Sequence, residues 1–133
     1  MPFFSIVIPT YNRADLLRET LKSVMAQTYE DFECIVVDDG GKDDTREMVN
    51  ALGDARITYV WKENAERGAA RNYGAQQAKG KWVNFVDSDD YLYPHHLEVA
   101  KKNTEKHSED CLFHLAYDMR VDDKIILERT DYP

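Results

Sequence analysis

The sequence predicts an α/β fold: a mostly parallel β-sheet flanked by helices, formed by a single domain over residues 1–133. The first observation is alternation, because short β-branched runs alternate with stretches of helical periodicity along the chain. The second is that the runs at 3–8, 32–37 and 82–86 are largely apolar at successive positions, which is typical of strands buried on both faces. The third is the length of 133 residues, which suits one domain with its own core.

The first half of the chain supplies two strand–helix pairs. The strand at 3–8 is followed by a helix at 14–26, whose apolar stripe consists of Leu16, Leu17, Leu21, Val24 and Met25. We expect Asn12 to cap this helix and Asp15 to suit its first turn. The strand at 32–37 is followed by a helix at 44–52, in which Asp44 and Glu47 have capping-box spacing.

The second half of the chain continues the alternation. A strand at 57–61 precedes a helix at 67–78 that Gly80 closes, and a fourth strand follows at 82–86. Pro94 is placed to open a fourth helix that ends near Lys106. Two further strands are expected at 111–118 and 124–128.

Charge and cysteine content exclude several classes of protein. The chain has 17 Lys and Arg against 25 Asp and Glu, a net charge of −8, which argues against nucleic acid or an anionic membrane as the main partner. An anionic ligand would therefore need a metal ion or a local cationic patch. Cys34 and Cys111 make neither a disulfide framework nor a zinc site, and reduced thiols predict a cytoplasmic protein. No apolar run approaches the ~20 residues of a membrane span.

The strongest motif is the acidic run Asp87-Ser88-Asp89-Asp90 at the end of the strand at 82–86. Clustered carboxylates repel one another unless a cation binds there, and hard oxygen ligands suit Mg²⁺ or Mn²⁺. Strand alternation would put Asp87 and Asp89 on the same side with Ser88 opposite. The alternative is a solvated acidic turn in which Asp90 prepares the next helix.

Other polar residues follow the strands or face them. The pair Asp38-Asp39 ends the second strand and predicts either a turn or a carboxylate that accepts hydrogen bonds from a base or ribose. Arg67 and Arg71 lie four apart on one helix face, where they could meet a diphosphate or solvent. Tyr11 could stack on a base or pack in the core. His95 and His96 follow Pro94 and are interpreted as a helix first turn rather than metal ligands.

Four segments together resemble family 2 glycosyltransferases, in the family's order and spacing: SIVIPTYNR at 5–13, VVDDG at 36–40, GAARNYG at 68–74 and FVDSDD at 85–90. The resemblance covers residues 4–106. It implies the GT-A fold and an inverting transfer of a sugar from a nucleotide diphosphate sugar, with UDP-sugar as the expected donor. The loops at 41–45 and 64–68 depart from the sequence pattern that is usual in the family.

The resemblance also implies roles for the matching residues. Asp87 and Asp89 match the family's D-x-D element, so Asp89 would ligate Mn²⁺ or Mg²⁺ and Asp87 would contact the ribose or the metal. Asp39 would hydrogen-bond the base, and Arg71 would lie near the base or the phosphates. Arg67 stands where the family is variable, so its role in binding is our inference from the helix face that it shares with Arg71. Asp38 is expected to be structural. The full expected substrate-binding set is Pro9, Thr10, Tyr11, Arg13, Asp39, Arg67, Arg71, Asp87 and Ser88.

An inverting transfer also needs a base that takes the proton of the acceptor hydroxyl. In the family this base lies well beyond the D-x-D strand, so we expect a C-terminally truncated, donor-binding half that is inactive alone. Glu109-Asp110 comes too early and is interpreted as a loop. The expected acceptor is a glycan or lipid-linked hydroxyl, at the cytoplasmic side of a membrane. Apolar residues at 111–128 predict self-association.

Two alternatives from other classes remain. A nucleotidyltransferase would need a glycine-rich basic loop after the first strand, and Pro9-Thr10-Tyr11-Asn12-Arg13 is not such a loop. A non-catalytic nucleotide-sugar-binding or assembly module would keep the same fold and would bind nucleotide without turnover.

Overall fold

The structure is a computed structural model of the whole chain, and it describes residues 1–65, 67–106, 117–121 and 124–129. For Arg67 and for 117–129 only the backbone is described. The chain divides into two compact units, Met1–Leu97 and Glu98–Pro133, which are treated separately below. Within the described residues, no helix has the length and apolar character needed to cross a bilayer.

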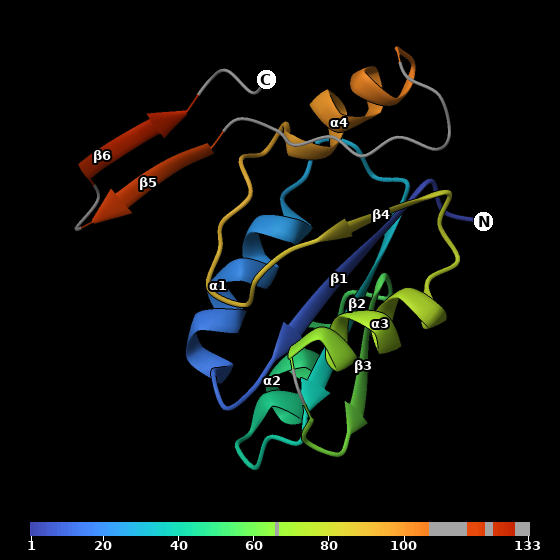
Figure 1. Cartoon of the computed structure of the whole chain (residues 1–133), viewed down its shortest axis with the longest axis vertical. Helices are drawn as coiled ribbons and strands as arrows, with labels where there is room; N and C mark the ends of the chain where they lie inside the picture. The colour runs from blue at the N-terminus through green and yellow to red at the C-terminus, as the bar shows by residue number, and fades with distance from the viewer. Residues whose placement is uncertain (66, 107–116, 122–123, 130–133) are drawn as a thin grey trace. The chain divides into compact units, whose positions relative to one another are not determined.

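A four-stranded parallel sheet forms the centre of the first unit (Figure 1). Its strands are β1 (Phe4–Thr10), β2 (Phe32–Asp39), β3 (Ile57–Lys62) and β4 (Trp82–Phe85), in the order β3-β2-β1-β4. β1 pairs with β2 from Phe4↔Phe32 to Thr10↔Asp38, and with β4 from Phe4↔Trp82 to Val7↔Phe85. The fold class predicted from the alternation is therefore confirmed, and the carboxyl ends of all four strands lie at one edge.

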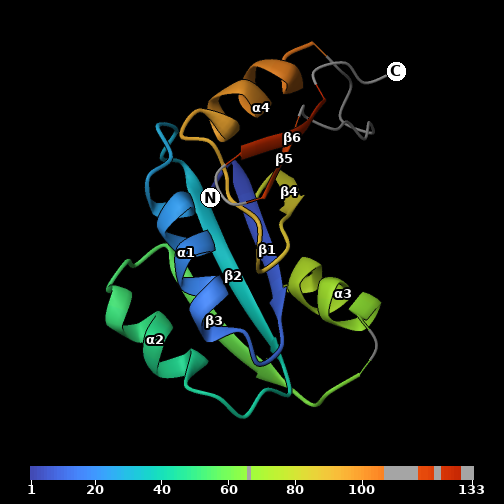
Figure 2. The ribbon, with the colours of Figure 1, turned by 90° about the vertical axis from the view of Figure 1, so that its left-hand side faces the viewer.

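Helices cover both faces of this sheet (Figure 2). α1 (Ala14–Met25) and α2 (Thr45–Leu52) lie on one face, and α3 (Arg67–Gln77) lies on the other. The Cβ that an alanine would add at Gly74 would fall 2.3 Å from Val7 Cγ1 and 3.1 Å from Val37 Cγ2, so α3 packs directly on β1 and β2. The close approach requires glycine at this position.

The core is centred on β1 and β2, whose residues are buried on both faces as predicted. β4 differs, because it is an edge strand and Val83 and Phe85 are 40% and 48% exposed. The prediction of a strand buried on both faces is wrong for β4. In α1 the buried residues are Ala14, Leu17, Thr20, Leu21 and Val24. The predicted stripe is therefore confirmed at Leu17, Leu21 and Val24 and wrong at Leu16, which is 52% exposed.

The starts of α1 and α2 share one carboxylate, Asp43. Its Oδ2 accepts a hydrogen bond from the Ala14 N–H at 3.1 Å, and its Oδ1 accepts bonds from the Thr45 hydroxyl at 2.6 Å and the Thr45 N–H at 3.3 Å. Burial alone would raise the pKa of Asp43, but these hydrogen bonds together lower it. The predicted cap by Asn12 is wrong, since its side-chain oxygen instead accepts a bond from the Lys42 N–H at 2.8 Å.

The second unit contains most of α4 (His96–Thr104) and an antiparallel hairpin of β5 (Tyr117–Val121) and β6 (Lys124–Arg129). The strand expected at 124–128 is confirmed as β6. The strand expected at 111–118 is placed later, at 117–121, and its residues 111–116 lie outside the described residues. The proposed self-association of this region stays a prediction.

Candidate functional site

A cavity of ≈ 400 Å³ opens at the carboxyl edge of the sheet. It lies where the ends of β1, β2 and β4 converge, which is the edge at which parallel α/β sheets bind ligands. Its lining residues are Pro9, Thr10, Tyr11, Arg13, Asp39, Asn64, Ala70, Asp87, Ser88 and Asp89. Eight of these ten are residues that the sequence predicted for substrate or metal binding.

The acidic run after β4 forms a turn, which the Asp90 N–H closes by donating to the Asp87 carbonyl oxygen at 3.1 Å. One carboxylate oxygen each from Asp87, Asp89 and Asp90 lies within 4.8 Å of the others. Asp87 and Asp89 thus lie together as predicted, while Ser88 is buried; the cause is a turn rather than strand alternation, because β4 ends at Phe85, and Asp90 joins the other two. Partial burial, and then the charges of Asp87 and Asp89, raise the pKa of Asp90. Three hard oxygen donors this close together fit Mg²⁺ or Mn²⁺.

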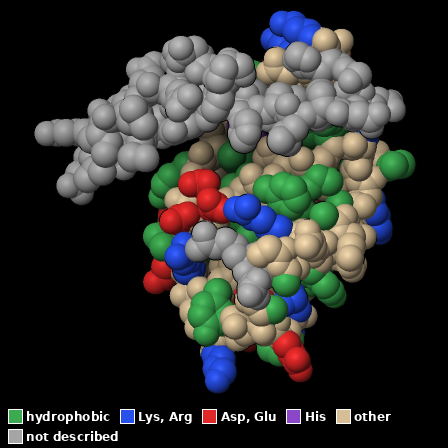
Figure 3. Space-filling view, viewed as in Figure 1, with side chains coloured by type: hydrophobic (Ala, Val, Ile, Leu, Met, Phe, Trp, Pro, Cys, Tyr) green, Lys and Arg blue, Asp and Glu red, His purple; other side chains and the backbone are tan. Residues whose placement is uncertain are grey.

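Two arginines pair with this acidic turn. Arg71 Nη2 lies 3.0 Å from Asp87 Oδ1, and Arg13 Nη1 lies 3.5 Å from Asp89 Oδ2. All four side chains are between 41% and 55% exposed, so these ion pairs contribute little to folding. Figure 3 shows acidic and basic side chains in contact on the face viewed there. The arrangement puts cationic groups beside the cavity of a chain whose net charge is −8.

Two buried polar atoms near the cavity have no hydrogen-bond partner among the described residues: Thr10 Oγ1 and Arg71 Nε. Thr10 is only 4% exposed and lines the cavity at the end of β1. Buried polar atoms are hydrogen-bonded in the large majority of cases. These orphaned atoms are therefore consistent with a polar ligand in the cavity.

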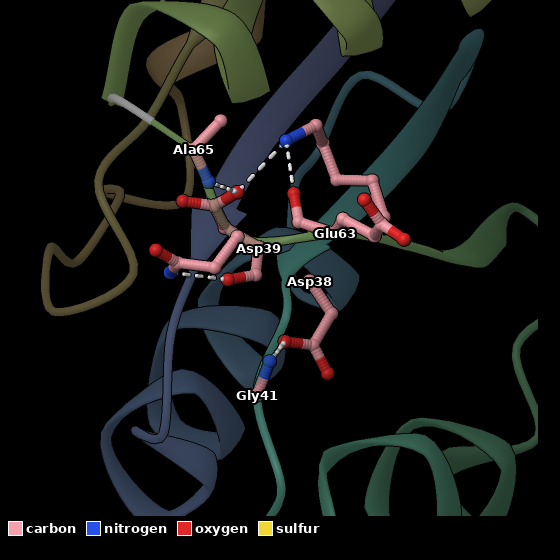
Figure 4. A network of polar contacts seen from close by, with 7 residues as sticks. Asp38, Asp39, Gly41, Glu63 and Ala65 are labelled. Atoms are coloured by element: carbon pink, nitrogen blue, oxygen red, sulfur yellow. Dashed lines mark hydrogen bonds and ion pairs between the residues drawn. The ribbon is translucent and has the colours of Figure 1, made fainter.

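The neighbouring carboxylates Asp38 and Asp39 serve different purposes (Figure 4). Asp38 is 2% exposed, and its Oδ1 accepts a hydrogen bond from the Gly41 N–H at 2.9 Å while its Oδ2 accepts one from the Tyr59 hydroxyl. This side chain fixes the loop after β2 and does not line the cavity. The hydrogen bond and burial raise the pKa of Tyr59, burial being the larger cause.

Asp39 lines the cavity and is held in place from one side. Its Oδ1 accepts hydrogen bonds from Lys62 Nζ at 2.9 Å and from the Ala65 N–H at 3.1 Å (Figure 4). Its main-chain oxygen accepts a third bond from Asn64 Nδ2 at 2.8 Å. The last residue of β3 and the segment after it thus fix the orientation of this carboxylate beside the cavity.

Sequence reasoning missed Asp90, Lys62, Asn64 and Ala70 as parts of the site. Asn64 and Ala70 fall in or beside the segments that resemble the family, but the spacing gave no role to either. The side chain of Arg67 lies outside the described residues. His96 is largely buried, which lowers its pKa, and its Nε2 lies 3.3 Å from Asn84 Oδ1. Among the described residues, neither His95 nor His96 joins the acidic cluster.

Known proteins share both the sequence and the fold. The profile of "Glycosyl transferase family 2" matches residues 5–125. An uncharacterized glycosyltransferase of Rickettsia typhi is 39% identical over 127 residues, which are 92% of this chain and 38% of that protein. The chain thus spans well under half the length of this relative.

Solved structures agree with the sequence comparison. S. aureus TarS 1–349 in complex with UDP-GlcNAc superposes with a TM-score of 0.74 at 34% identity, over 80% of this chain and 32% of that one. The mannosyltransferase PcManGT from Pyrobaculum calidifontis, in complex with GDP-Man and Mn²⁺, gives 0.69 at 29% identity, over 76% and 32%. Their fold is the GT-A fold of glycosyltransferases. The chain belongs to glycosyl transferase family 2.

Proposed function

We propose that the cavity binds a nucleotide diphosphate sugar together with Mn²⁺ or Mg²⁺, for inverting transfer of the sugar to an acceptor hydroxyl. The observation that carries this proposal is that Asp87, Asp89, Arg13 and the orphaned Thr10 hydroxyl line one cavity, while Asp90 and Arg71 lie against the same acidic turn. A neighbour bound to UDP-GlcNAc and another bound to GDP-Man and Mn²⁺ support the ligand class. UDP is the nucleotide that we test.

Each group at the edge has a proposed task. Asp87, Asp89 and Asp90 would hold the cation, which would offset the negative charge of the departing diphosphate. Arg13 and Arg71 are close enough to these carboxylates to bind diphosphate oxygens once the cation has taken their present partners.

The nucleoside would lie toward β1 and β2. Thr10 offers a free hydroxyl, and Tyr11, 50% exposed, offers a ring face for stacking on the base. Asp39 would accept a hydrogen bond from the base, because Lys62 and Ala65 both bond its Oδ1, and no bond to its Oδ2 occurs among the described residues. Pro9 and Ser88 complete the wall of this cavity.

We assign the task of taking the acceptor proton to none of the residues around the cavity. Glu109 and Asp110 lie outside the described residues, and Asp118 is described only as backbone in β5. Three further statements stay predictions: the acceptor is a glycan or lipid-linked hydroxyl, the protein is cytoplasmic, and residues 1–133 alone are inactive.

The test is calorimetric titration of UDP with Mn²⁺, with Mg²⁺ and with EDTA. We expect tighter binding with either cation. Asp89→Asn should abolish the gain and leave the chain folded, with a slightly raised melting temperature because one source of like-charge repulsion is removed. Asp15→Asn is the matched control, since it makes the same charge change at a side chain that is 95% exposed on α1. Equal affinity with cation and with EDTA would refute the metal site.

A further inference from the structure

The acidic turn belongs to a connection without regular structure, residues 86–95, that runs from β4 to α4. Backbone polar groups that are buried without a helix or strand to pair them need other partners. Three polar side chains supply them: Thr20 and Ser23 on α1, and Gln27 just after it. Their spacing of three and four residues puts them on one face of the helix. We call them the α1 clamp.

Thr20 acts at the centre of the acidic turn. It is 1% exposed, and its hydroxyl donates to the main-chain oxygen of Ser88 at 3.0 Å. Ser88 lies between Asp87 and Asp89 in the chain, so this bond holds the peptide that links the two carboxylates. A weaker contact of the same hydroxyl reaches its own helix at the Leu16 carbonyl oxygen, at 3.3 Å.

Ser23 and Gln27 hold the rest of the connection. Ser23 Oγ accepts a hydrogen bond from the Leu92 N–H at 3.1 Å and donates to the Thr20 carbonyl oxygen at 2.6 Å. Gln27 is 5% exposed, donates to the Tyr93 carbonyl oxygen at 2.8 Å, and accepts a bond from the Leu97 N–H at 3.0 Å. The connection is thus bonded to α1 from the acidic turn to the start of α4.

We propose that the α1 clamp positions the acidic turn for cation binding, with Thr20 as the principal positioning residue. Groups that are held in place before a ligand arrives bind it more tightly, because their ordering is not paid for at the moment of binding. The α1 clamp touches neither the cavity nor the carboxylates, so it acts through the backbone of the turn. This proposal rests on the proposed function, since it assumes that the turn binds a cation.

The substitutions separate positioning from general stability. Thr20→Val keeps the shape and removes the hydroxyl, whereas Thr20→Ser keeps the hydroxyl and should restore the wild-type behaviour. Ser5→Ala is the matched control: Ser5 is 0% exposed and donates to Glu33 Oε1 at 2.7 Å, at the amino end of β1 and away from the acidic turn. Both Thr20→Val and Ser5→Ala remove a buried hydroxyl of the first unit.

Two measurements are made on the full chain, at temperatures where every variant is folded. The first is amide hydrogen exchange over residues 87–93, which needs no ligand. The second is the affinity for UDP with Mn²⁺ and with EDTA. For Thr20→Val we expect faster exchange in the turn and about fivefold weaker Mn²⁺-dependent binding, which corresponds to the loss of one net hydrogen bond. Ser5→Ala should lower the melting temperature without changing either measurement.

The outcomes distinguish the two proposals. Unchanged exchange in Thr20→Val, or the same change in Ser5→Ala, would overturn the role of the α1 clamp. Faster exchange with unchanged Mn²⁺-dependent affinity would overturn it as well, because the turn would then not need to be held. A wild-type chain that binds UDP equally with Mn²⁺ and EDTA would overturn the metal site, and with it the positioning of a cation. If Thr20→Val nevertheless showed faster exchange in the turn, the hydrogen bonds of the α1 clamp would serve the fold alone.

Discussion

Two carboxylates that are adjacent in the chain differ in what they contact. Asp38 is saturated by the Gly41 N–H and the Tyr59 hydroxyl, whereas Asp39 is bonded on one oxygen by Lys62 and Ala65 and lines the cavity. Successive residues of a strand point to opposite faces, so one of the two is directed to the loop and the other to the cavity. Two neighbours of identical chemistry therefore have different surroundings: Asp38 fixes a loop, and Asp39 is the one that we propose contacts the nucleoside.

We expect Asp39→Asn to weaken UDP binding by about tenfold, both with Mn²⁺ and with EDTA. The physical reason is the loss of a charged acceptor, and a hydrogen bond to a charged group is worth ~1.5–3 kcal/mol. Calorimetry in both conditions measures it. Asp89→Asn is the comparison, since it should reduce only the Mn²⁺-dependent part. A loss confined to the Mn²⁺ condition would place Asp39 at the metal rather than at the nucleoside.

The sequence predicted most of the cavity-lining residues because the segments that resemble the family directly follow predicted strands, and ligands bind at the carboxyl ends of parallel strands. It did not predict the geometry of the acidic turn. Whether Asp90 lies with Asp87 or away from it depends on where β4 ends and on the Asp90 N–H bond to the Asp87 carbonyl oxygen. The partner of Arg71 is likewise set by how α3 lies on the sheet, which periodicity does not give.

At the scale of elements, α3 connects the core to the site. One face of this helix packs on β1 and β2 through Gly74, while Arg71, one turn earlier, reaches Asp87. Ala70 is 1% exposed, packs with Val7 and Val37, and also lines the cavity. The distance between α3 and the sheet therefore helps to set the position of Arg71.

Gly74→Ala should destabilise the chain by about 1–3 kcal/mol. The new methyl group would meet Val7 and Val37, and overpacking outweighs the ~1 kcal/mol that alanine gains over glycine in a helix. Gly68→Ala is the matched control in the same helix, where a new Cβ meets nothing within 4 Å and should be neutral or stabilising. Urea unfolding of both variants tests this. Equal stability of the two would mean that α3 packs more loosely than described.

Periodicity predicted α1 and most of its buried stripe, because Leu17, Leu21 and Val24 are buried as expected, but it failed at one position. Leu16 is half exposed, and the threonine at position 20 is buried in its place. A threonine in a helix is expected on the solvent side unless its hydroxyl finds a partner. The partner here is the Ser88 carbonyl oxygen, 68 residues away, and no local pattern announces it.

At the scale of the whole chain, acidic residues outnumber basic ones, and a few of them are held by the fold. Asp43 joins the starts of α1 and α2. Asp54 Oδ2 accepts a hydrogen bond from Arg56 Nη2 at 2.7 Å. The hydrogen bond from Arg56 lowers the pKa of Asp54. Burial raises the pKa of Asp43, but its hydrogen bonds outweigh this effect and lower the pKa. The pKa of Asp90 shifts in the opposite direction, since burial and its acidic neighbours raise it.

The free energy of unfolding should therefore fall as the pH drops below about 4, the usual pKa of a free aspartate. A carboxyl whose folded pKa is lowered stabilises the folded state above its unfolded pKa, and this stabilisation is lost as pH falls through the folded pKa. Urea unfolding between pH 7 and pH 3 measures the slope. Asp43→Asn should make the slope shallower, whereas Asp90→Asn should raise stability at pH 7. A slope unchanged by Asp43→Asn would contradict the shared cap.

The parallel order of the sheet has a consequence for the time course of folding. β1 lies between β2 and β4, and its Ser5 hydroxyl accepts a bond from the Gly80 N–H, 75 residues further along the chain. Closing so long a loop is entropically costly, and contacts between distant residues form slowly. During synthesis β1 and β2 leave the ribosome well before β4, so β1 keeps an open edge until the chain has passed residue 85. The acidic turn follows β4 at once, and the site is therefore assembled only when this last strand of the sheet is paired.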